Sequence, residues 1–208
     1  MSVLNKLASS LNRRDEVPNQ ELALEIVHDN NKQAVKELVE NLNNSKDIQS
    51  DCIKVLYEIG ELKPALIAAY AKEFITLLDS KNNRLQWGAM TALNTIALEK
   101  PEEVYAALPK IVAVADNGTV ITKDHCVNIL VKLCSIKKYA DDAFALLMEQ
   151  LLNSPTNQMP TYAEKAMPFV NDKNKALFIK TLLSRVNDIE SETKLKRVEK
   201  VIKKVSGK

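Results

Sequence analysis

The sequence predicts an all-α fold in which helical hairpins stack on one another, and three observations support this. First, small or apolar residues recur every 37 residues in one register. Second, polar turns recur at almost the same spacing, starting at residues 43, 79, 116 and 153. Third, the chain has only 4 glycines and 5% aromatic residues, and this composition disfavours a β fold. The recurring columns are Cys52, Ala89, Cys126 and Ala163; Leu56, Leu93, Leu130 and Met167; and Ile59, Ile96, Leu133 and Val170.

The N-terminal elements fit this register poorly, as the end units of a repeat array often do. Leu4, Leu7 and Leu11 form a short amphipathic stripe, so residues 1–17 are expected to form an N-terminal cap. Pro18 then opens a helix, and a second helix follows before the polar turn at residue 43. These two helices make the first hairpin.

Three regular units come next, each with two helices. The first helices are expected at about 46–60, 83–98 and 119–135, and the second at about 64–78, 101–115 and 138–152. Pro64 and Pro101 stand at the start of second helices, where a missing N–H costs nothing. In the fifth unit, Pro160 and Pro168 interrupt the first helix, and the second is expected at about 172–186. We therefore predict a single domain over 1–208, with repeats at 18–189 and a basic capping helix at 190–208.

Composition indicates a soluble cytoplasmic protein without a membrane partner. The N-terminus lacks the apolar stretch of a signal peptide, and no run is long enough to span a bilayer. Residues 194–208 carry seven basic residues and one acid, a net charge of +6. Because the whole chain has a net charge of +2, residues 1–193 carry −4. Cys52, Cys126 and Cys134 are expected to be reduced core residues, because two repeat units separate the first two.

Two segments resemble the HEAT repeat family. The segment Leu85–Ala97, LQWGAMTALNTIA, is similar to the first helix of a HEAT repeat, and Leu56–Gly60, LYEIG, matches the end of that helix in the preceding unit. The resemblance covers roughly residues 18–190. It implies a right-handed α-solenoid of about five hairpins that binds proteins along its side surfaces. The sequence differs from the family at Gln86, where an arginine is usual, and lacks the typical first-helix proline in the three regular units.

The sequence predicts no enzyme activity, metal site or cofactor. His28 and His125 are the only histidines, lie in different units and have no ligand partner at metal-binding spacing. The glycines form no phosphate loop, and no nucleophile with an adjacent base is suggested by position.

The predicted function is a non-catalytic scaffold that binds an unidentified protein or peptide along the solenoid surface. Trp87 is the leading candidate anchor, because its repeat counterparts Ser50, Asp124 and Thr161 are all polar. The alternative is that its ring covers the neighbouring inter-unit turn. The second helices are expected to expose three further columns of residues. The candidate partner-binding residues in these columns are Lys72, Tyr105, Asp142 and Gln150, and Ala68 belongs to one of the same columns.

Two other functions remain open. The basic C-terminal helix could bind nucleic acid through phosphate contacts, or it could be a solvated end cap. Its candidate phosphate-binding residues are Lys196, Arg197, Lys200, Lys203 and Lys204. The HEAT resemblance also implies a HEAT-like alkylpurine DNA glycosylase as an alternative, although the acidic body of the chain disfavours DNA.

Overall fold

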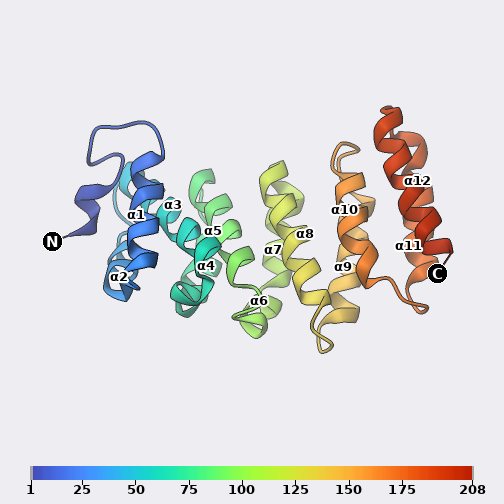
Figure 1. Ribbon diagram of the computed structural model, residues 1–208, viewed down its shortest axis with the longest axis horizontal. Helices are drawn as coiled ribbons and strands as arrows, with labels where there is room; N and C mark the ends of the chain where they lie inside the picture. The colour runs from blue at the N-terminus through green and yellow to red at the C-terminus, as the bar shows by residue number, and fades with distance from the viewer. Residues whose placement is uncertain (1, 208) are drawn as a thin grey trace. The chain divides into compact units, whose positions relative to one another are not determined.

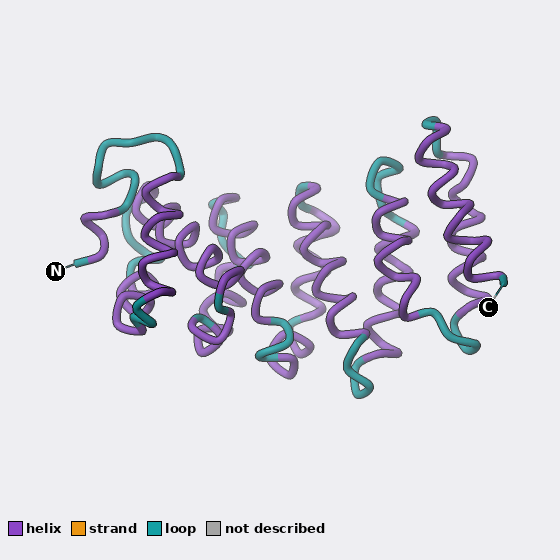
Figure 2. The backbone as a smooth tube through the Cα atoms, viewed as in Figure 1, coloured by secondary structure: helices purple, strands orange, loops and turns teal. Residues whose placement is uncertain are grey.

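The computed structural model describes residues 2–207, and every regular element in that range is a helix (Figure 2). The prediction of an all-α fold is therefore confirmed. The chain divides into two compact units, Met1–Cys126 and Val127–Lys208, and the boundary falls inside helix α8, Val120–Cys134. A single continuous domain stays a prediction. Within residues 2–207, no helix combines the length and apolar character that crossing a membrane requires.

The first unit holds α1 to α7 and the start of α8 (Figure 1). Its α-helices are α1 (Val17–His28), α2 (Lys32–Glu40), α3 (Lys46–Leu62), α4 (Ala71–Leu77), α5 (Asn83–Ile96), α6 (Pro101–Ala106) and α7 (Leu108–Asn117). Short 3-10 helices add η1 (Val3–Lys6), η2 (Pro64–Leu66) and η3 (Ala68–Tyr70).

Helix α3 is the centre of this unit. It packs against α1, α2 and α5, and all eight residues from 50 to 57 are buried. A helix buried on every side is a core helix rather than an amphipathic surface helix. Because residues 50–57 are buried on all sides, the polar side chains among them need hydrogen-bond or ionic partners within the protein.

Two glycines let α3 and α5 approach closely. A Cβ on Gly88 of α5 would lie 2.7 Å from Ile53 of α3, and a Cβ on Gly60 of α3 would overlap the Thr95 side chain of α5. In both contacts the α5 residue lies 35 positions after the α3 residue that it touches. A constant offset means that the two helices run in the same direction. Their N-terminal ends therefore lie at the same edge.

The 37-residue columns are buried as predicted in the regular units. Cys52, Ala89 and Cys126 have no exposed surface, and neither do Leu56, Leu93 and Leu130. All three cysteines are free and buried. Burial raises the pKa of each thiol to about 12, with Asp51 adding to the effect at Cys52 and Asp116 at Cys126. The prediction that all three cysteines are core residues is confirmed.

The second helices differ from the prediction because they are interrupted. The expected helix at 64–78 begins as two 3-10 helices and becomes α-helical only at Ala71. The expected helix at 101–115 is divided between α6 and α7, with Pro109 in the first turn of α7. Proline has no N–H with which to continue the hydrogen bonds of α6. These interruptions change which faces are exposed, and Ala68, predicted to be exposed, is buried with 7% exposure.

The N-terminal cap is less regular than its leucine stripe suggested. Leu7 is fully buried, but Leu11 is 49% exposed. The 3-10 helix η1 ends at Lys6, and the chain then turns until Asn12, which has a positive φ of 55°. Leu11 therefore lies outside the buried face that a continuous helix would have given it.

The second unit holds the rest of α8 and four further α-helices. These are α9 (Ala140–Leu152), α10 (Met159–Ala166), α11 (Lys175–Arg185) and α12 (Glu192–Ser206), with 3-10 helices η4 (Met167–Phe169) and η5 (Val186–Asp188). Helix α12 packs on α10 and α11 through Val198, Val201 and Val205. The break predicted in the first helix of the fifth hairpin is present, because α10 ends at Ala166 and a 3-10 turn containing Pro168 follows. Met167 and Val170 are only half-buried as a result.

The buried columns predict a large cost for opening a cavity. Replacing Leu93 with alanine should destabilise the protein by about 2–5 kcal/mol, because the side chain is fully buried. Chemical denaturation followed by circular dichroism measures this loss. A change below about 1 kcal/mol would contradict the register, and Leu98→Ala is the control because Leu98 is 54% exposed.

Candidate functional site

Trp87 lines an open depression of about 690 Å³ at the N-terminal ends of α3 and α5. We call this the Trp87 depression. Helix α3 contributes Lys46 and Gln49, the segment before α5 contributes Lys81 and Asn82, and the first turns of α5 contribute Asn83, Arg84 and Trp87. The parallel course of α3 and α5 brings these two segments together. The lining carries three cations, one aromatic ring and no carboxylate.

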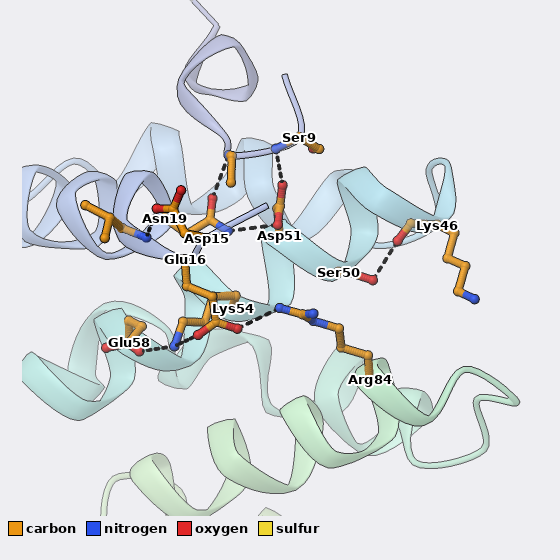
Figure 3. Close-up of polar contacts among 12 residues, drawn as sticks. Ser9, Asp15, Glu16, Asn19, Lys46, Ser50, Asp51, Lys54, Glu58 and Arg84 are labelled. Atoms are coloured by element: carbon orange, nitrogen blue, oxygen red, sulfur yellow. Dashed lines mark hydrogen bonds and ion pairs between the residues drawn. The ribbon is translucent and has the colours of Figure 1, made fainter. Parts of the chain in front are cut away.

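An ionic cluster around the buried Lys54 adjoins this depression and shares Arg84 with it (Figure 3). The carboxylate of Glu16 accepts from Arg84 through Oε1 at 2.7 Å and pairs with the Lys54 amino group through Oε2 at 2.9 Å. Lys54 also donates to Glu58, which lies a helical turn further along α3. Figure 3 shows Lys54 and Arg84 reaching Glu16 from either side. Glu16 therefore links α3 to α5 from the segment just before α1.

Lys54 keeps its charge although its side chain is only 7% exposed. Burial disfavours the ammonium, but hydrogen bonds to Glu16 and Glu58 outweigh that effect and raise the pKa of Lys54. Its amino group lies 4.9 Å from the centre of the Tyr57 ring, a cation–π contact. The Tyr57 ring in turn packs on Trp87 with a distance of 5.8 Å between ring centres and a tilt of 50°. The ionic cluster thus supports one side of the indole.

A second buried polar group fixes the N-terminal segment to this region. Asp51 of α3 is 8% exposed and accepts hydrogen bonds from the Ser9 backbone N–H and from Asn19 Nδ2, each at 2.8 Å. Asn19 accepts from the Ala8 backbone N–H at 3.0 Å. Since both oxygens of Asp51 are used to hold the chain in place, this carboxylate has a structural role.

The indole also borders a second, smaller depression of about 240 Å³. This second depression has no charged side chain and is lined by Asn83, Gln86, Trp87, Asn117, Gly118, Thr119 and Thr122. Asn117 and Thr119 flank the turn that precedes α8. Trp87 therefore lies beside a turn between two successive helical hairpins. It borders both a basic depression and a neutral one.

Neither depression beside Trp87 includes the other candidate binding residues from the sequence. Lys72 is exposed and Tyr105 half-buried in the first unit, whereas Asp142 is exposed in the second. The prediction that Gln150 is exposed is wrong, because its side chain is 5% exposed. Helix α9 packs against both α10 and α11, so more of its circumference is covered than a single exposed face allows.

Some cations of α12 are engaged inside the second unit. Arg197 forms a bidentate pair with Glu164 of α10, through Nε at 2.9 Å and Nη2 at 2.7 Å, and also donates to Thr161. Lys196 pairs with Glu192 at 2.5 Å on the same helix. Lys200, Lys203 and Lys204 remain exposed. The helix thus has a docked face and a solvated basic face.

The Glu16 cluster was not predicted from the sequence, although one repeat column indicates a polar role for Lys54. Lys54, Thr91, Asn128 and Lys165 recur at intervals of 37 residues and are polar throughout, beside columns that are apolar throughout. Each of these four residues has a polar partner: Thr91 Oγ1 lies 3.0 Å from His125 Nε2, and Lys165 donates to Asn128 at 2.6 Å. A polar column in register with buried ones indicates inter-helix hydrogen bonds.

No cluster of three or more His, Cys, Asp or Glu side chains within residues 2–207 is arranged to hold a metal ion. Comparison with known proteins adds no assignment, since neither a protein-family model nor a curated protein matches the chain.

The ionic cluster predicts a selective effect of removing Lys54. Lys54→Met should lower the free energy of unfolding by about 1–3 kcal/mol, because it leaves Glu58 and Glu16 facing each other without their shared cation. The matched control is Lys36→Met, whose pair with Glu40 has the same spacing but is exposed. Equal losses for the two variants in urea denaturation would contradict a structural role for the cluster.

The Arg197–Glu164 pair predicts a pH-dependent contribution to stability. The hydrogen bond from Arg197 lowers the pKa of Glu164 below its ordinary value of 4.5. A lowered carboxyl pKa stabilises the fold above 4.5 and loses that effect as the pH falls through the lowered value.

Arg197→Gln should therefore cost about 0.5–1 kcal/mol at pH 7, a modest figure because both side chains are about 40% exposed. The difference from the parent protein should shrink below pH 4.5. Thermal unfolding at a series of pH values measures it. A cost independent of pH would show that the pair acts through packing alone.

Proposed function

We propose that this protein is a non-catalytic scaffold of HEAT-like helical hairpins that binds a peptide or protein along its surface. The observation that carries the proposal is Trp87, a large aromatic side chain at the surface between two depressions. The buried 37-residue columns and the parallel course of α3 and α5 support an α-solenoid arrangement. Arrays of this kind present long side surfaces to partners.

The surroundings of Trp87 suit a binding anchor. Aromatic side chains contribute most of the energy at many protein interfaces, and they contribute more when they are already held in place. Trp87 packs on the Tyr57 ring, and the Lys54 ammonium contacts that ring in turn. Binding would therefore order little that is not ordered already.

Nucleic-acid binding through α12 is the alternative outcome. A phosphate backbone is bound by several cations acting together. Two of the five candidate cations, Lys196 and Arg197, already pair with carboxylates, which leaves Lys200, Lys203 and Lys204 for such contacts. This arrangement supports an end cap more than a nucleic-acid interface.

Affinity capture from a lysate of the native organism, with and without nuclease, tests the proposal. Three baits are compared: the parent protein, Trp87→Ala, and a variant with Lys200, Lys203 and Lys204 changed to glutamine. We expect a protein partner that persists after nuclease, is lost with Trp87→Ala and is kept by the lysine variant. Capture that requires nucleic acid and is lost only in the lysine variant would contradict the proposal. Circular dichroism of each bait verifies that it is folded.

A further inference from the structure

The Trp87 depression has an excess of positive charge and of hydrogen-bond donors. Among the described residues, 2–207, the amino groups of Lys46 and Lys81 form no ion pair. Figure 3 shows the Lys46 side chain extending away from its labelled neighbours. Two further donors in the lining, Asn82 Nδ2 and Arg84 Nε, are buried without a hydrogen-bond partner. Buried polar groups are normally satisfied, so two such donors at one place are a reason to look for an acceptor.

The backbone adds to this positive potential. Helices α3 and α5 begin at Lys46 and Asn83, and both N-terminal ends lie at the depression. The first turn of a helix carries unsatisfied N–H groups and a partial positive charge that attracts anions. Side chains and helix ends therefore favour the same kind of ligand, a negatively charged one.

The surroundings limit how far that negative charge can extend. On one side lies a neighbouring pocket that shares Lys46 and Arg84 with the depression. Its lining balances those two cations, Arg13 and Arg14 with four carboxylates: Asp15, Glu16, Asp47 and Asp51. On the other side, beyond Trp87, the second depression is lined by amides and hydroxyls without charge. A long polyanion would meet the carboxylates or leave most of its charge unpaired. A ligand with a few acidic groups beside uncharged ones fits better.

We propose that the Trp87 depression binds a short acidic segment of a partner protein. Lys46, Lys81 and the helix ends receive its carboxylates, and the indole of Trp87 contacts an apolar side chain that follows them. The uncharged continuation of the peptide lies over the second depression, where Asn83, Gln86 and Thr119 offer hydrogen bonds. This inference rests on the proposed scaffold function and specifies the chemistry of its partner.

Trp87 is the single tryptophan of the chain, so its fluorescence reports directly on this site. The probes are a set of synthetic peptides in which a run of glutamates precedes leucine, phenylalanine or proline. Each has a counterpart with glutamine in place of glutamate, and oligothymidylate serves as a non-peptide polyanion. We expect saturable changes in emission with glutamate peptides that weaken as salt is added.

Charge reversal locates the contact. The double variant Lys46→Glu, Lys81→Glu should weaken binding of the glutamate peptides about tenfold or more, since two favourable charges become repulsive. The matched control, Lys203→Glu with Lys204→Glu, makes the same change in net charge on α12 and should leave binding unchanged. All four lysines are exposed, so neither double variant disturbs the core.

Three results would overturn the inference: equal binding of the glutamine peptides, equal effects of the two double variants, or tighter binding of oligothymidylate than of any glutamate peptide. These results are distinguishable from failure of the scaffold function. If Trp87→Ala still abolishes capture of a protein partner while no glutamate peptide binds, the scaffold stands and the acidic specificity is wrong. If capture does not depend on Trp87 either, both are wrong.

Discussion

The close, parallel contact between α3 and α5 is the interaction on which the candidate site depends. Gly60 and Gly88 leave no side chain at the two points where the helices meet, so Thr95 and Ile53 can fill that space. Helices that run in the same direction place both N-terminal ends at one edge. The Trp87 depression is the consequence, because Lys46 begins α3 at the same edge where Asn83 begins α5.

The buried charge of Lys54 next to that edge ties the segments of the site together. Removing Lys54 from water disfavours its ammonium, and only two carboxylates close to it make the arrangement favourable. Glu16, the first of these, also holds Arg84, so the segment before α1 is tied to α3 and α5 at once. Among residues 2–207, the exposed Lys46 and Lys81 form no ion pair of this kind. The same edge therefore has paired charges around Lys54 and unpaired cations at Lys46 and Lys81, which suits recognition of a small number of negative charges.

The sequence predicted much of the fold and little of the site, for physical reasons. Burial recurs with the repeat, so the columns at Leu56, Leu93 and Leu130 could be read from spacing alone. The breaks in the second helices could not be read from spacing. Because of these breaks, Ala68 is buried although it was predicted to be exposed. Trp87 stood out because the other residues of its column are polar. The residues of the ionic cluster that supports Trp87 did not stand out in the sequence. Glu16 and Arg84 are 68 positions apart, and no spacing rule connects them.

Site-specific photocrosslinking in the native cells tests the central claim most directly. Asn83 borders both depressions and is exposed, so a photoreactive residue at this position lies within reach of a bound protein. The control places the same residue at Leu183, which is 56% exposed on α11. We expect covalent adducts to a protein from position 83 and none from position 183. Adducts of equal yield from both positions, or from a third probe at Lys203 alone, would contradict a binding site at Trp87.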